Sequence, residues 1–205
     1  RYLDYGIIAV RDGGDKGNIG LKAKKISCRD DLLAPIINAS GYVIRKKCYY
    51  GAFLGEGVTD LRKIECIIKK LAQNKVNQIK VLISGIVSFK NYGKVGPLQF
   101  SLTEIKRIVE KSHEMNLKVM AHASSDKAVQ IAVEAGVDSI EHGYFVKNST
   151  LKQMVERNSF WVPTVVPVYK QYVMPWKEKF TDKQISIISK TYNHQLKTIK
   201  RAAKF

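Results

Sequence analysis

Hydrophobic positions along the chain alternate between short continuous runs and longer stretches in which they recur every three or four residues. Runs of strand length separated by helix-period stretches are typical of β/α units that share a parallel sheet. This pattern predicts strands at residues 7–10, 36–44, 79–83, 118–121, 139–141 and 160–166. It predicts helices at residues 18–26, 60–75, 101–115, 125–135, 149–157 and 182–204. We therefore expect five to six β/α units.

Local signals mark several ends of these elements. Asp60 can cap the helix that follows it, and Ser101 with Glu104 has the spacing of a capping box. Gly136 is expected to stop the helix before the strand at 139–141. Residues 84–100 are polar, contain glycine and are long for a connection, so they form a candidate active-site loop.

The length of the chain limits the fold. A closed barrel of eight β/α units normally needs about 250 residues, and this chain has 205. We therefore expect an α/β fold in the form of a partial TIM-like (β/α) barrel, as a single domain over residues 1–205. The chain opens at Arg1 and runs almost at once into the apolar stretch 6–10. This predicts an internal part of a longer protein whose N-terminal and C-terminal parts are absent.

The formal net charge is +17, from 35 Lys and Arg against 18 Asp and Glu. Such an excess of positive charge raises the question of whether the protein binds nucleic acid or an anionic membrane surface. The basic residues are dispersed in short runs, and no arginine–aromatic interleaving of the kind that stacks bases is evident. We expect a solvated, lysine-rich surface and no nucleic-acid partner. A nucleic-acid binder with salt-sensitive affinity is a third interpretation, which no fold-level motif supports.

The cysteines and the hydropathy of the chain indicate the cellular compartment in which the protein is expected. Cys28, Cys48 and Cys66 are odd in number and widely spaced, so they predict neither a disulfide framework nor a Cys-x-x-Cys metal site. No window approaches the roughly 20 apolar residues of a membrane helix, and nothing resembles a signal peptide. We expect a cytoplasmic protein with no membrane partner. Assembly into a homo-oligomer is left open.

Three polar residues stand where strands are predicted. Lys80 lies inside an apolar strand, where a bare ammonium group would be costly to desolvate. Either its side chain reaches water near a strand end, or its amine is neutral and can react with carbon dioxide to form an anionic carbamate. His122 and His142 each follow a short apolar strand, one unit apart, where a barrel assembles its site. The alternative is a pair of hydrogen-bonded core histidines.

The other two histidines have no such placement. His113 and His194 fall within predicted helices, and we expect both on the surface.

Three segments carry a family resemblance: Ile79 to Gly85, Val119 to Ala123 and, above all, Ala135 to Gly143. They resemble the amidohydrolase superfamily, near its imidazolonepropionase-like and Xaa-Pro dipeptidase-like members. Shorter matches are Val10-Arg11-Asp12, Ala39-Ser40-Gly41 and Val162-Pro163-Thr164. The resemblance implies the metal-dependent hydrolase barrel, covered here from about Tyr5 to Val168.

The resemblance also implies a metal site. Lys80 would be carboxylated and bridge two divalent metals, commonly zinc, and His122 and His142 would bind the second metal. The implied reaction is hydrolysis of an amide-type C–N bond in a small-molecule amide or peptide substrate, such as a dipeptide or a cyclic amide. Tyr144, just past His142, is a candidate substrate-binding residue, although a packing role fits its position equally well.

Two elements of the family pattern are missing. No His-x-His pair occurs, and the aspartate expected as a metal ligand and general base would lie beyond Phe205. Cys48 to Gly51 stands where relatives carry a Gly-Gly-His-Gly loop. We therefore expect this fragment alone to be inactive. The competing interpretation is a non-catalytic barrel remnant or interaction module.

Overall fold

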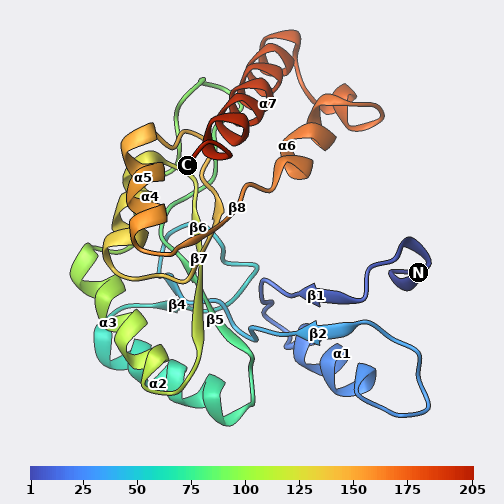
Figure 1. Cartoon of the computed structure of the whole chain (residues 1–205), viewed down its shortest axis with the longest axis vertical. Helices are drawn as coiled ribbons and strands as arrows, with labels where there is room; N and C mark the ends of the chain where they lie inside the picture. Colours follow the sequence, from blue (N-terminus) through green and yellow to red (C-terminus); the bar gives the residue numbers. More distant parts are fainter. The chain divides into compact units, whose positions relative to one another are not determined.

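The computed structural model describes all 205 residues, and it is an α/β protein in which parallel strands alternate with helices (Figure 1). The strands are β1 (Ala9–Arg11), β2 (Ile36–Asn38), β3 (Arg45–Lys46), β4 (Gly57–Val58), β5 (Gln78–Leu82), β6 (Lys118–Ala123), β7 (Ser139–His142) and β8 (Phe160–Val162). The α-helices are α1 (Ile19–Ser27), α2 (Leu61–Gln73), α3 (Leu102–His113), α4 (Asp126–Glu134), α5 (Asn148–Glu156), α6 (Val165–Tyr172) and α7 (Asp182–Ala202). Two short 3₁₀ turns, Leu3–Tyr5 and Trp176–Lys179, complete the set.

The chain forms two compact units. The first contains residues 1–82 and 106–120, and the second contains residues 83–105 and 121–205. Helix α3 and strand β6 contribute residues to both units. The single-domain organisation expected for residues 1–205 stays a prediction.

In the first unit, short parallel strands pair beside an amphipathic helix. β1 pairs with β2, β3 pairs with β4, and Ile44 forms a parallel bridge with Val81 of β5. Helix α2 begins where the sequence predicts, because the Asp60 carboxylate accepts a hydrogen bond from the Lys63 backbone N–H. Its apolar stripe of Ile64, Ile68 and Leu71 is buried, as the helical period requires.

In the second unit, the end of β6 is followed in the sheet by β7 and then β8. β7 and β8 are parallel, with Ile140 opposite Trp161. Helix α4 buries most of its apolar residues and is capped by Ser125, whose hydroxyl accepts from the Ala128 N–H. Helices α6 and α7 pack against each other (Figure 1, orange and red). No helix of the chain combines the length and apolar character needed to cross a membrane.

Two predicted strands are shorter than expected. The strand predicted at 160–166 ends at Val162, because Pro163 lacks an N–H and Thr164 takes a left-handed conformation with φ of 46°. Helix α6, which the hydrophobic pattern did not indicate, begins directly afterwards. The extended stretch predicted at 36–44 pairs as a strand only over Ile36–Asn38, since Gly41 turns the chain with φ of 66°.

Candidate metal site

His122 lies in β6, one residue before its end, and is buried. Its Nε2 is 3.1 Å from the carbonyl oxygen of Gly85 and 3.2 Å from the hydroxyl of Ser124. Because a carbonyl only accepts hydrogen bonds, this contact assigns the proton to Nε2 and the lone pair to Nδ1. Ser84 holds Gly85 in place, because the Ser84 hydroxyl donates to the Gly85 carbonyl and accepts from the Ser124 N–H.

His142 ends β7 with a left-handed backbone, at φ of 79°, and Gly143 continues it at φ of 57°. Such a conformation costs a residue other than glycine about 1–3 kcal/mol and persists only where its surroundings hold it. Two donors hold the His142 carbonyl: the Trp161 indole Nε1 at 3.0 Å and the Gln195 Nε2 at 2.6 Å. A Cβ on Gly143 would lie 2.8 Å from the Trp161 Nε1, so this position needs glycine.

The ring of His142 has its own partner. Its Nδ1 lies 2.6 Å from the hydroxyl oxygen of Thr164, just past β8. When Nδ1 carries the proton and the hydroxyl accepts it, Nε2 carries the lone pair. A hydrogen bond of this kind on one ring nitrogen commonly orients a histidine whose other nitrogen binds a metal.

The two rings lie against each other. The centroids of His122 and His142 are 4.4 Å apart, with the ring planes inclined at 69°. Rings this close, each with one lone-pair nitrogen, fit a pair of ligands to one divalent cation, for which neutral imidazole is a suitable donor. No group of three or more His, Cys, Asp and Glu side chains gathers in the structure. Among these residue types the two imidazoles therefore form a pair, not a complete ligand set.

Tyr144 stacks on the site. Its ring lies 5.7 Å from the ring of His142 at an angle of 14°, and only 4% of the residue is exposed. It belongs to a buried cluster with Val87, Val168 and Ile188. Tyr144 therefore packs in this cluster, which is the alternative to substrate binding that its position in the sequence also allowed. A contact with substrate stays a prediction.

Lys80 lies in the first compact unit, at the centre of β5, whose five residues are all buried. Only 6% of Lys80 is exposed, which does not fit a side chain that reaches bulk water. Its backbone carbonyl accepts a hydrogen bond from the Ile44 N–H at 2.8 Å. The burial of a lysine in the middle of a strand is the unusual feature that the sequence indicated.

The remaining histidines differ from each other. His113 is exposed, as expected. The expectation for His194 was wrong, because the residue is half-buried against Tyr92 and Phe145, with ring centroids 6.5 Å and 5.5 Å away. Burial, followed by the positive charges of Arg201 and Lys197, lowers the pKa of His194.

The loop that departs from the family pattern is organised by Arg45 in the first unit. The buried Arg45 guanidinium donates to the backbone carbonyls of Gly55, Lys46 and Tyr49 at 2.8, 3.2 and 3.2 Å. Cys48 within this loop is left-handed, at φ of 67°, and exposed. The loop therefore has a defined backbone without the histidine that the family resemblance implies at this position.

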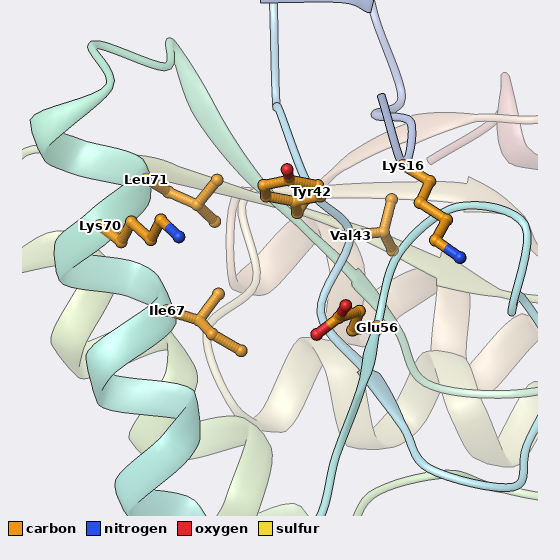
Figure 2. A pocket seen from close by; sticks show the side chains of 7 residues that line it. All are labelled: Lys16, Tyr42, Val43, Glu56, Ile67, Lys70 and Leu71. Carbon is orange, nitrogen blue, oxygen red and sulfur yellow. The ribbon is translucent and has the colours of Figure 1, made fainter. Parts of the chain in front are cut away.

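A separate cavity of about 220 Å³ also lies in the first unit (Figure 2). Figure 2 shows Lys70 and Glu56 extending toward it from α2 and from the segment before β4. Its lining consists of Lys16, Tyr42, Val43, Glu56, Ile67, Lys70 and Leu71. None of the predicted site residues lines this cavity.

Sequence reasoning missed the groups that hold the two imidazoles: Gly85, Trp161, Thr164 and Gln195. Thr164 stands in the Val162-Pro163-Thr164 match, which was a usable signal. Gln195 gave none, because a glutamine within a polar helical stretch is normally exposed.

Comparison with known proteins places the chain in a family. The family model described as "Amidohydrolase family" matches residues 6–199. An uncharacterised protein of Mycobacterium tuberculosis is 26% identical over 163 residues, covering 80% of this chain and 42% of the relative. Ochratoxinase of Aspergillus niger is 26% identical over 132 residues, covering 63% of this chain and 27% of the relative.

Solved structures show the same fold. A Xaa-Pro dipeptidase with bound methionine superposes with a TM-score of 0.76 at 21% identity, over 96% of this chain and 52% of its own. The A. niger ochratoxinase superposes with a TM-score of 0.80 at 18% identity, over 99% and 51%. This chain thus spans about half the length of these solved structures, and less of the curated relatives. The predicted partial TIM-like (β/α) barrel is confirmed, and the chain belongs to the Amidohydrolase family, a family of hydrolases.

Proposed function

We propose that the protein is a metal-dependent hydrolase that cleaves an amide-type C–N bond in a small molecule, a dipeptide or a cyclic amide. One observation carries the proposal: the rings of His122 and His142 lie 4.4 Å apart between centroids. Each ring makes a hydrogen-bond contact through one nitrogen, Nε2 of His122 with Gly85 and Nδ1 of His142 with Thr164, and a neutral imidazole has a lone pair on one of its two nitrogens. Such a pair suits a divalent cation better than it suits a hydrophobic core.

We assign the proposed ligands as follows. Nδ1 of His122 and Nε2 of His142 would hold one divalent ion, for which zinc is the first candidate. By the family resemblance, Lys80 would be carboxylated and would bridge two such ions in the longer protein. A divalent ion supplies the reaction with water whose pKa is lowered to about 7, and it polarises a carbonyl oxygen.

The residues of this chain would orient the ligands and the substrate. The Gly85 carbonyl, which only accepts, favours the proton of His122 on Nε2, and the Thr164 hydroxyl, when it accepts from Nδ1 of His142, would favour the tautomer with the lone pair on Nε2. Tyr144, stacked on His142, would form one wall of the substrate site. The name of the Xaa-Pro dipeptidase supports a substrate with a peptide bond.

The polypeptide of residues 1–205 would itself be inactive, since it lacks the His-x-His pair and the general-base aspartate that the resemblance implies. Its three free thiols support a reducing, cytoplasmic location.

The test is a hydrolysis screen with the full-length protein. Xaa-Pro dipeptides and N-acyl amino acids are incubated with added zinc, and amine release is measured for the wild type and for His142→Asn. The proposal expects turnover by the wild type and loss of at least about 100-fold in the variant, more than is typical for groups behind a metal ligand. Equal rates for the two proteins would refute the assignment of His142. No turnover and no zinc bound would favour the non-catalytic interpretation.

A further inference from the structure

The buried face of α7 is unusual for a helix that packs on a core. Its buried positions are Ile188, Thr191, Gln195 and Thr198, each at most 1% exposed. Three of these four residues are polar, and buried polar groups require hydrogen-bond partners. Thr191 and Thr198 satisfy their hydroxyls within the helix, by donating to the carbonyls of Ile187 and His194. Gln195 instead reaches away from its helix.

The Gln195 amide joins two segments of the second unit. Its Nε2 donates to the carbonyl of His142 at 2.6 Å and to the carbonyl of Pro163 at 2.9 Å. The first carbonyl belongs to the last residue of β7. The second immediately precedes Thr164, whose hydroxyl contacts the Nδ1 of His142. One amide group therefore holds both the backbone of His142 and the backbone of its hydrogen-bond partner.

The other end of the same amide is left unsatisfied. Because both partners of Gln195 are carbonyls, the NH₂ group must face them, and the orientation of the amide is fixed. Its Oε1 is then buried with no hydrogen-bond partner. A side chain that leaves a buried acceptor unpaired is poorly explained by packing alone, which an apolar residue of similar size would serve better.

We infer that Gln195 is a positioning residue for His142. Its two hydrogen bonds, together with that of the Trp161 indole, keep the left-handed turn at His142 in place. They also keep the Thr164 hydroxyl against Nδ1 of His142, a contact that orients the ring and, when the hydroxyl accepts, favours the tautomer with the lone pair on Nε2. This inference rests on the proposed function insofar as a metal ion is the partner of Nε2.

The test compares Gln195→Leu with Thr191→Val in the full-length protein. Thr191 is a matched control, because it is equally buried on the same helix but bonds only to that helix. Two quantities are measured: the tautomer of His142 by ¹⁵N NMR without metal, and the zinc dissociation constant by competition with a chelator. Gln195→Leu should turn a single tautomer into a mixture and weaken zinc binding by about 10–100-fold. Thr191→Val should change neither.

A second variant guards against a folding defect. Gln195→Glu keeps the length of the side chain and replaces the amide donor with oxygen, so it should show the same two changes. Unchanged tautomer and unchanged zinc affinity in a folded Gln195 variant would overturn the inference, and so would equal effects in the control. A wild type that binds no zinc would instead count against the proposed function, while the tautomer measurement would still decide the role of Gln195.

Discussion

Nδ1 of His142 and Oγ1 of Thr164 lie 2.6 Å apart, although 22 residues separate them in the chain. Both residues have left-handed backbones, at φ of 79° and 46°. Thr164 is β-branched, and such residues rarely adopt this conformation. The contact thus joins two constrained positions at the ends of neighbouring strands, and it orients the ring of His142.

Replacement of Thr164 with valine should weaken zinc binding by about 10–100-fold, because the ring loses the group that orients it. Serine at the same position retains the hydroxyl and should bind zinc nearly as well as threonine. Calorimetric titration of the two variants with zinc checks this. Equal affinities for valine and serine would show that the hydroxyl contact has no part in binding.

Replacement of Lys80 with methionine should abolish hydrolysis but preserve the fold. Methionine has a side chain of similar length and no charge, so it suits the interior of a strand whose five residues are all buried. Urea denaturation and the hydrolysis assay measure the two effects. Lys118, an exposed lysine of β6, is the control, and Lys118→Met should keep full activity. Full activity of Lys80→Met would exclude a role as a ligand.

The stability of the protein should fall as the pH drops below about 6.5, the ordinary pKa of histidine. Burial lowers the pKa of His194 in the folded state, so the unfolded chain takes up the proton more readily. Stability is therefore lost between the ordinary pKa and the lower folded pKa. Thermal unfolding from pH 8 to pH 5 checks this, with His194→Phe as comparison. The variant should show a flatter pH dependence, and an unchanged slope would contradict the prediction.

Replacement of Asp15 with alanine should destabilise the protein by about 1 kcal/mol, as for loss of a helix-capping residue. The Asp15 carboxylate accepts from the backbone N–H groups of Gly17, Ile19 and Gly20 at 2.7, 2.9 and 3.0 Å, at the start of α1. Burial raises its pKa, but these three hydrogen bonds outweigh burial and lower it overall. The contribution is therefore present at neutral pH and lost as the pH falls through the lowered pKa.

Urea denaturation at pH 7 measures this effect. Asp30→Ala, a change at an exposed aspartate, is the control and should leave the midpoint unchanged. A midpoint for Asp15→Ala equal to that of the control would contradict the prediction.

The fold was predictable where local interactions determine it. The capping box of Ser101 and Glu104 forms as expected, with Glu104 accepting from the Ser101 N–H and the Ser101 hydroxyl accepting from the Glu104 N–H. Gly136 has φ of 83° and follows the end of α4. The strand beginning at Phe160 was less predictable, because the left-handed turn at Thr164 depends on a ring 22 residues away.

The candidate site was likewise predictable only in part. His122 and His142 stood out because strand periodicity places them at strand ends, and the structure brings their rings together. The hydrogen bonds that hold them span 37 residues for Gly85 and 53 residues for Gln195. Single-sequence patterns do not encode separations of this size. The error for His194 has the same origin, since its aromatic neighbours come from distant segments.

Arg45 holds the loop that follows it from its buried side. Its guanidinium donates hydrogen bonds to the carbonyls of Lys46, Tyr49 and Gly55, while Tyr49 and Phe53 are 39% and 64% exposed. The path of the backbone thus depends on Arg45 and not on the exposed side chains. Substitution of those side chains can therefore change the chemistry of this surface while the backbone keeps its path.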